Sequence, residues 1–293
     1  MEEQQHKTRL ELLLEEVNRS EISSIHQTLT RIIRIINDPT SSAKQLKDVI
    51  ELDPPLSAKV LRRANSAYYG ATHSIDEIQQ AIVWLGFDMV KELALSQKVC
   101  ELFESNGVIG DFSRGALWKH SVAVALCGKL ICRREFRQRG DNVYAAGLLH
   151  DMGLIIEDQF LHDEFTSIHE HKRKFDNNMP PVEHKQLGFT HSTIGQRLAE
   201  LWNFPFELST CIGLHHTPSE AAGEFRRQVL TLYVADQLCM QEGIGFCDEP
   251  AGDHDLLKAC LAELDIKGVA AYLIVGEVRD EIEKMEKQGW FHS

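Results

Sequence analysis

The sequence predicts an all-α fold built from two helical subdomains. Apolar residues recur every three or four positions along most of the chain, which is the spacing of a helix that buries one face. Signals that begin or end helices, such as Asp53-Pro54 and Gly86, bound many of these stripes. No segment alternates apolar and polar residues over the length of a strand. The 293 residues fit about two ordinary domains or one elongated helical unit.

The first subdomain is expected over residues 21–110, after a helical extension over residues 1–20. Its predicted helices are Ile22–Ile36, a short helix through Ile50 capped by Ser41 or Ser42, a helix through Ala64 opened by Asp53-Pro54, a helix from Ile78 behind a capping box of Ser74 and Glu77, and Met89–Phe103. The break from Ser105 to Gly110 marks the expected boundary with the second subdomain.

The second subdomain is expected over residues 111–242 and opens with a long helix from about Ser113 to Phe136. Further helices are predicted at 142–150, 158–174, 182–188, 191–202, 205–215 and 225–241. Residues 243–293 then form a loop to Asp255 and two closing helices, 256–264 and 268–287. The last helix carries an apolar stripe that packs on the domain or forms a homodimer contact, and Trp290-Phe291 is expected to be exposed unless it docks.

Composition narrows the class of protein. The 31 Lys and Arg against 44 Asp and Glu give a net charge of −13, which disfavours nucleic-acid binding because phosphate backbones are repelled. Seven scattered cysteines without a Cys-x-x-Cys pair argue against a disulfide framework and for a reduced, cytoplasmic protein. The charged start predicts no signal peptide, and no apolar run approaches the about 18 residues of a membrane span.

Histidines and aspartates recur within or at the edges of the predicted helices of the second subdomain. The residues are His120, His150, Asp151, His191, His215, His216 and Asp236. Imidazole and carboxylate together suit divalent Fe, Mn, Zn or Ni, and a pair of such ions needs about this many ligands. The set therefore predicts a metal site.

Each member alone also has a plainer interpretation. His120 can be a packed core histidine, His150-Asp151 a helix-end histidine beside a capping carboxylate, and His215-His216 a solvated pair. Adjacent residues on a helix point about 100° apart, so His150-Asp151 can hold one ion only where the helix ends or bends, as Gly153 permits. Asp236 lies in an apolar stretch, where a carboxylate is costly unless it is paired or binds a cation. Taken together, the residues favour metal binding.

The order of a lone His, a His-Asp pair and a late Asp resembles the HD superfamily of metal-dependent phosphohydrolases. His191 and His215-His216 resemble the dinuclear HD-GYP phosphodiesterases of cyclic di-GMP. Over about residues 22–240 the chain resembles the HDOD family, the HD-related output domain. The motifs that carry this resemblance are Asn37-Asp38-Pro39, Leu52–Leu56, Arg63–Gly70 and Ile78–Gly86. The resemblance implies a second subdomain that is an HD-domain-like helical bundle, and a role in bacterial signal transduction.

Two departures from the HD-GYP pattern bear on activity. The lysine that helps to hold substrate phosphate in that group corresponds here to Leu154, and Thr217–Glu220 stands where the acidic and Gly-Tyr-Pro elements are expected. The resemblance thus favours a protein that acts mainly through contacts with signalling proteins, with the metal-bearing subdomain as a framework. A nucleotide ligand remains open.

The alternative is a metal-dependent phosphohydrolase or phosphodiesterase acting on a nucleotide or cyclic nucleotide. Asp151 would then bridge two ions, and a metal-bound hydroxide would attack phosphorus. The first ion would be held by His120, His150 and Asp236, and the second mainly by His191, His215 and His216. Under either hypothesis we expect one or two ions of Fe or Mn, with Ni or Zn as the other candidates.

Overall fold

The computed structural model of the protein describes residues 2–104, 108–109, 112–175, 178–247 and 252–291. Within these residues the chain is almost entirely helical, which confirms the predicted fold class. Its one sheet is an antiparallel hairpin of β1 (Val108–Ile109) and β2 (Phe112–Ser113), in which Val108 faces Ser113. The hairpin lies at the predicted break between subdomains, and the rest of that break is outside the described residues.

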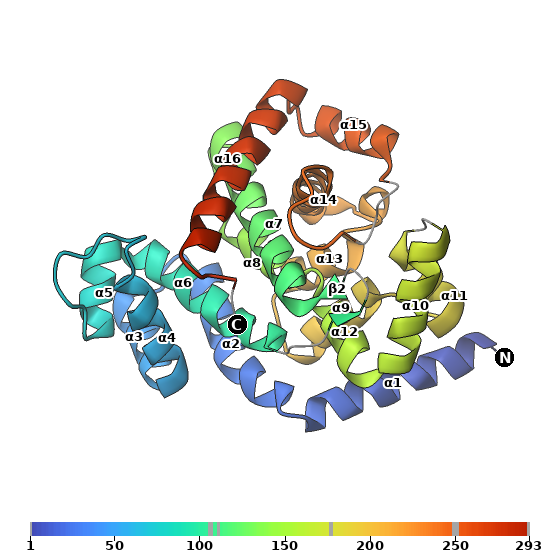
Figure 1. Ribbon diagram of the computed structural model, residues 1–293, viewed down its shortest axis with the longest axis horizontal. Coiled ribbons are helices and arrows are strands. Elements are labelled where there is room, and N and C mark those ends of the chain that lie inside the picture. The colour runs from blue at the N-terminus through green and yellow to red at the C-terminus, as the bar shows by residue number, and fades with distance from the viewer. Residues whose placement is uncertain (1, 105–107, 110–111, 176–177, 248–251, 292–293) are drawn as a thin grey trace.

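Short helices before the hairpin form a lobe at one end of the molecule (Figure 1). The elements before the hairpin are α1 (Glu2–Arg19), which lies outside the lobe, and α2 (Ile22–Asn37), α3 (Ala43–Glu51), α4 (Pro54–Ala64), α5 (Ile78–Leu85), α6 (Phe87–Cys100) and the 3-10 turn η1 (Glu101–Phe103). Helix α2 packs on α6, and α3, α4 and α5 surround the far end of this pair. Helix α1 leaves the lobe and contacts α9 and α12 of the second half.

The helix starts of this lobe follow the predicted caps with one exception. Ser42 caps α3 in a reciprocal box with Gln45, and the Asp53 carboxylate accepts from the backbone N–H of Leu56 at the start of α4. The predicted box before Ile78 is wrong. The Ser74 hydroxyl donates to Asp76 instead, so it does not reach the first turn of α5.

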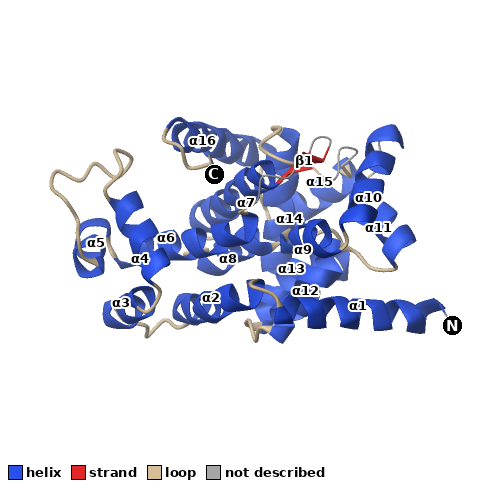
Figure 2. Ribbon diagram, turned by 60° about the horizontal axis from the view of Figure 1, so that its bottom comes forward, coloured by secondary structure: helices blue, strands red, loops and turns tan. Residues whose placement is uncertain are grey.

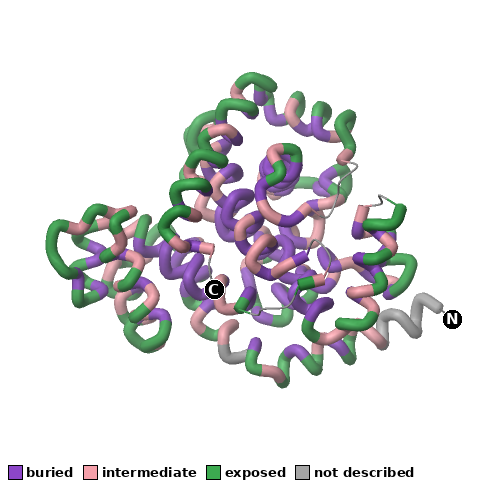
Figure 3. Tube along the Cα trace, viewed as in Figure 1, coloured by how far each residue is buried: buried purple, intermediate pink, exposed green. Residues whose placement is uncertain are grey.

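The second half is a bundle around α7, α8 and α14. Its elements are α7 (Arg114–Glu135), α8 (Asp141–Leu149), α9 (Met152–Phe160), α10 (His162–Phe175), α11 (Met179–Leu187), α12 (His191–Leu201), α13 (Phe206–Leu214), η2 (Pro218–Glu220), η3 (Gly223–Phe225), α14 (Arg226–Gln241), α15 (His254–Glu263) and α16 (Gly268–Lys287). Figure 3 shows that the buried residues concentrate in these central helices. A Cβ on Gly147 would lie 2.5 Å from the Cα of Ala125, so the small residue lets α8 approach α7 closely.

The predicted helix over 158–174 covers the last residues of α9 and nearly all of α10, and the first six residues of α9 were not predicted as helix. Helix α9 begins directly after Asp151, and the chain turns at Leu161, where φ is −130° and ψ is 40°. The turn lets α9 pack on α12 while α10 packs on α11. No glycine or proline marks the turn, so tertiary packing rather than a local signal divides the segment.

The closing helix α16 packs on α7 and α14, on the side of the molecule opposite α1 and α2 (Figure 2). Its residues Val278, Ile282 and Met285 are buried, whereas Val269 and Leu273 are exposed. Trp290 is also buried, so the end of the described chain docks instead of protruding. Among the described helices, none combines the length and the apolar composition needed to cross a membrane.

Candidate metal centre

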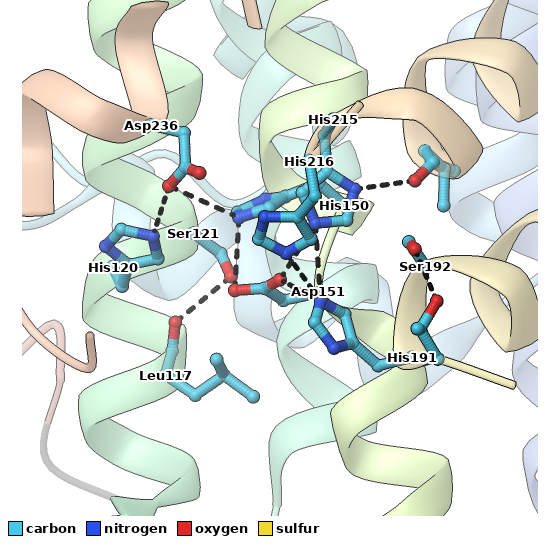
Figure 4. A network of polar contacts seen from close by, with 12 residues as sticks. Leu117, His120, Ser121, His150, Asp151, His191, Ser192, His215, His216 and Asp236 are labelled. Carbon is cyan, nitrogen blue, oxygen red and sulfur yellow. Dashed lines mark hydrogen bonds and ion pairs between the residues drawn. The ribbon is translucent and has the colours of Figure 1, made fainter. Parts of the chain in front are cut away.

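The structure brings all seven sequence-predicted residues to one place in the middle of the bundle (Figure 4). His120 and Asp236 project from within α7 and α14, whereas the other five lie at helix ends. His150 and Asp151 join α8 to α9, His191 is the first residue of α12, and His215 with His216 follows α13. The predicted break at Asp151 exists, and it lets two adjacent side chains face the same centre.

Asp151 lies between two groups of donors. Its Oδ2 is 3.1 Å from His150 Nε2, and its Oδ1 is 3.5 Å from the Nε2 atoms of both His191 and His215. One group comprises His120, His150 and Asp151, and the other comprises Asp151, His191, His215 and His216. Each group offers ligand atoms within 4.8 Å of one another. A carboxylate with one oxygen toward each group is placed as a bridge.

Asp236 completes the first group. Its Oδ1 is 2.9 Å from His120 Nε2 and 3.8 Å from His150 Nε2. The Asp236 side chain is only 1% exposed, so it needs a partner of positive charge. In this fold that partner is the histidine pair or a cation between them.

The second nitrogen of four histidines is anchored, which fixes the orientation of each ring. His120 Nδ1 lies 3.1 Å from the carbonyl of Ile244, His150 Nδ1 lies 2.8 Å from that of Gly147, and His215 Nδ1 lies 2.6 Å from that of Ile212. His191 Nδ1 is 2.8 Å from Glu183. A neutral imidazole that donates through Nδ1 presents the lone pair of Nε2, which is the form that binds a metal.

A divalent ion fits the remaining polar atoms. Buried atoms without a hydrogen-bond partner include His150 Nε2, Asp151 Oδ1 and Asp236 Oδ2. His191 Nε2 is 2.9 Å from His216 Nε2 and 3.4 Å from His215 Nε2. Ligands about 2.0–2.2 Å from one ion lie roughly 3.0–3.5 Å apart, so these spacings are those of a coordination shell. The arrangement is therefore a His/Asp cluster suited to a divalent metal.

The protonation states also suit a cation. Burial would raise the pKa of Asp151, but the imidazoles around it, His150 first, hold that pKa well below its usual range. Burial and the neighbouring His216 lower the pKa of His215 to about 4. Burial lowers the pKa of His150, yet the Asp151 carboxylate outweighs it and the net shift is upward. A bound ion would replace that proton, because metal and proton compete for the same nitrogen.

Sequence reasoning missed a carboxylate pair behind His191. Glu183, on α11, is fully buried, and its carboxylate accepts from the backbone N–H of His191 at 2.9 Å as well as lying against Nδ1. Glu157, on α9, is also fully buried, and burial together with Glu183 raises its pKa well above the ordinary value. A Glu157 that keeps its proton adds no second negative charge beside Glu183, which leaves the Glu183 carboxylate to orient His191. In the sequence, the one sign of this carboxylate pair is that Glu183 lies eight residues before His191.

The centre is buried, and its carboxylates pair with histidines. Six of the seven residues are at most 2% exposed, and only His216 is partly exposed. Leu154, which stands where the HD-GYP enzymes have their lysine, is completely buried. Within the described chain, the ion pairs of Asp151 and Asp236 are all with histidines. The carboxylates of the centre are therefore balanced by imidazoles or by a bound ion.

Comparisons with known proteins identify the fold and the family. An HDOD protein of unknown function from Geobacter sulfurreducens has the same fold with a TM-score of 0.76, at 27% identity over 95% of this chain and 96% of the other. A protein from Shewanella amazonensis SB2B, provisionally described as a phosphohydrolase, gives a TM-score of 0.66 at 22% identity, over 96% of each chain.

A protein from Marinobacter aquaeolei VT8, provisionally described as a signal transduction protein, gives a TM-score of 0.72 at 24% identity, over 91% of this chain and 59% of the other. An uncharacterized protein of Treponema pallidum is 23% identical over 220 residues, 74% of this chain. This chain spans 42% of the length of that relative. The HDOD domain family matches residues 22–218, which is most of the described fold, and the chain belongs to that family.

Proposed function

We propose that the protein is a bacterial signal-transduction protein that acts mainly through contacts with other proteins. In this proposal the HD-like half is a framework held together by one or two divalent ions, Fe or Mn in the first instance and Ni or Zn otherwise. The seven His and Asp residues of the centre are the ligands. A protein partner in signalling binds the first lobe.

The closure of the centre carries this proposal. A hydrolase must admit a phosphoester and balance its charge, usually with Arg or Lys beside the ion. Here the donors are buried, Leu154 fills the position of the phosphate-holding lysine, and the carboxylates pair with histidines alone in the described chain. A metal in such surroundings contributes to folding more readily than to turnover.

The first lobe offers a surface for a partner. Val83 on α5 is 78% exposed and the neighbouring Trp84 is 41% exposed, within the segment Ile78–Gly86 that carries the family resemblance. Large exposed apolar side chains side by side mark contact surfaces more often than isolated ones do. A signalling protein that covers this turn of α5 would bury both.

Two measurements on the same preparation test the framework role. Protein purified without chelator is expected to contain metal and to unfold at a lower temperature once the metal is removed. The same loaded protein is expected to leave cyclic dinucleotides and nucleoside phosphates unhydrolysed. Turnover that follows metal loading and disappears in Asp151→Asn would contradict the framework role.

Site-specific photo-crosslinking tests the contact surface. A crosslinker at Val83 is expected to trap one defined protein in cells, and the same crosslinker at Val269 of α16, which is 73% exposed, serves as a matched control. Identical adducts from both positions would remove the first lobe as the specific contact surface.

The second candidate is a metal-dependent phosphohydrolase of nucleotides or cyclic nucleotides. The complete set of donors and the bridging position of Asp151 favour it. Two bound metal ions would supply Lewis acidity at phosphorus. The chain's own part would be to hold the ions through Asp151, to keep each histidine Nε2 free of protons, and to admit substrate past His216, the one partly exposed member.

A further inference from the structure

A cavity of about 450 Å³ lies between the two halves of the fold. Its walls come from α4 and the turn after it, from the end of α6 with η1, from the first turns of α7, and from the residues after α16. The volume lies within the roughly 300–1,000 Å³ that small-molecule pockets occupy. Its lining contains none of the seven residues of the metal centre.

The cavity is basic although the chain as a whole carries a charge of −13. It is lined by Lys59, Arg62, Arg63 and Arg114, with Glu104 as the one acidic residue among its lining side chains. Two of these cations are already neutralised. Lys59 pairs with Glu104 at 2.7 Å, and Arg114 pairs with Asp158 at 2.6 Å.

Arg62 and Arg63 are the cations left over. Neither has an ion pair with a carboxylate within the described residues. Arg63 is half-buried and its guanidinium lies 4.4 Å from the ring centroid of Trp290, while Arg62 next to it is exposed. Both arginines line the same cavity and neither has a carboxylate partner, so the cavity offers positive charge to a small anion, and the planar guanidinium forks suit phosphate or carboxylate oxygens.

Two buried donors in the same walls also lack acceptors. The hydroxyl of Ser66 and the indole Nε1–H of Trp290 are both buried without a hydrogen-bond partner. Trp290 as a residue is only 7% exposed. Buried donors are satisfied in the great majority of proteins, so two beside one cavity leave room for an acceptor, which a ligand would supply after a small shift of the walls.

The remaining walls are aromatic. Trp118 and Phe103 pack at 5.1 Å between ring centroids, and Trp290 and Phe291 line the side formed by the end of the chain. Aromatic faces stack on planar heterocycles, and such stacking tolerates many bases. The cavity thus combines cationic and aromatic side chains in one lining.

The end of the described chain completes the cavity. The residues after α16 run back toward α6 and the start of α7 (Figure 1). Arg63 donates to the carbonyl of Trp290 at 3.4 Å, and the carbonyl of Phe291 would lie 3.9 Å from a Cβ on Gly115. A ligand here would therefore contact the first lobe, α7 and the closing segment together.

We propose that this cavity binds a nucleoside monophosphate, with the phosphate at Arg62 and Arg63 and the base against the aromatic walls. Ser66 and Trp290 donate to the ligand's oxygen or ring-nitrogen acceptors. The motif Arg63–Gly70, which the metal centre does not use, supplies two of these contacts. The proposal does not depend on metal or on hydrolysis.

Calorimetric titration of the full chain with AMP and GMP, run in parallel with Trp fluorescence, tests the proposal. We expect one nucleotide per chain, with Arg62→Ala weakening binding about tenfold because a charge-assisted contact is lost. Arg62 is exposed, so this variant is expected to fold. Trp290→Phe keeps a ring but removes the N–H, and is expected to weaken binding by a smaller factor.

Three controls separate the proposal from its rivals. Arg133→Ala removes an exposed arginine of α7 that does not line the cavity, and this variant is expected to bind the nucleotide as the parent does. His150→Ala disables the metal centre and is expected to keep nucleotide binding. Inorganic phosphate and salicylate, an aromatic carboxylate, are expected to bind more weakly than AMP or GMP.

Other results would overturn it. These are the absence of nucleotide binding at millimolar concentration, equal affinity for inorganic phosphate or salicylate, and binding that survives Arg62→Ala but is lost in His150→Ala. The last result would place the nucleotide at the metal centre instead.

Discussion

Gly153 lies directly against the carbonyl of His191. A Cβ added at Gly153 would stand 2.0 Å from that oxygen and 2.6 Å from the carbonyl carbon. The contact joins the start of α9 to the start of α12, two turns that each carry part of the metal centre. Only a residue without a side chain lets these two turns meet, so the centre depends on this glycine as well as on its ligands.

Gly153→Ala is expected to cost about 3 kcal/mol of folding stability, because neither backbone can move without shifting buried helices. Gly276→Ala in α16 is the matched control. A Cβ there meets nothing within 4 Å, so the change is expected to increase folding stability by roughly 0.5–1 kcal/mol, because alanine has the higher helix propensity. Urea unfolding of both variants measures the difference, and equal stabilities would disprove the steric argument.

His150→Ala is expected to lose metal. Protein purified without chelator or nickel affinity resin should hold about two equivalents of Fe or Mn if both donor groups are filled. His184→Ala, an exposed histidine on α11, should keep the parent's content. Elemental analysis of the three proteins decides the point, and metal retained by His150→Ala would contradict the assignment of this ligand.

Glu183→Gln is expected to weaken metal binding by about 10–100-fold, because the amide no longer fixes the orientation and basicity of His191. Competition with a chelator of known affinity measures the change. The variant keeps the shape of the side chain, so a normal circular dichroism spectrum should accompany the loss. Unchanged affinity would limit Glu183 to a structural role.

Glu157→Gln is expected to make stability at neutral and alkaline pH greater than in the parent. The folded state raises the pKa of Glu157. The stabilisation that this group contributes to the parent protein is therefore complete below about pH 4.5, and it is lost as the pH rises through the pKa of the folded state. Glutamine cannot lose that proton and can still donate to Glu183. Thermal unfolding from pH 5 to 9 should show that the difference in unfolding temperature between the variant and the parent grows with pH. A difference that stays constant would exclude this titration.

Local chemistry accounts for the parts of the fold that were predicted correctly. Ser42 and Asp53 cap their helices because the polar side chain and the start of the apolar stripe coincide in sequence. Ser74 fails as a cap for a local reason, because its hydroxyl donates to Asp76 two residues on. The turn at Leu161 has no such local cause; it follows from the packing of α9 and α10 on different neighbours, and no short window of the sequence encodes that packing.

The candidate site divides in the same way. The seven His and Asp residues of the candidate centre could be picked out because His and Asp are unusual in apolar helical contexts. Glu183 and Glu157 lie in polar-looking segments, and only the folded chain reveals that both are completely buried. The basic cavity was equally hidden, since Arg62 and Trp290 are far apart in sequence.

The burial of the centre has a kinetic consequence. If the centre binds an ion, the donors come from α7, the junction of α8 and α9, α12, α13 and α14, and six of the seven are nearly inaccessible, so we expect release of the ion to require that helices separate. Its dissociation rate would then equal the rate of that opening, which is far slower than ligand exchange in water. The metal status of each molecule would be set once, when the chain folds, and would record the metal supply at its synthesis rather than follow later changes.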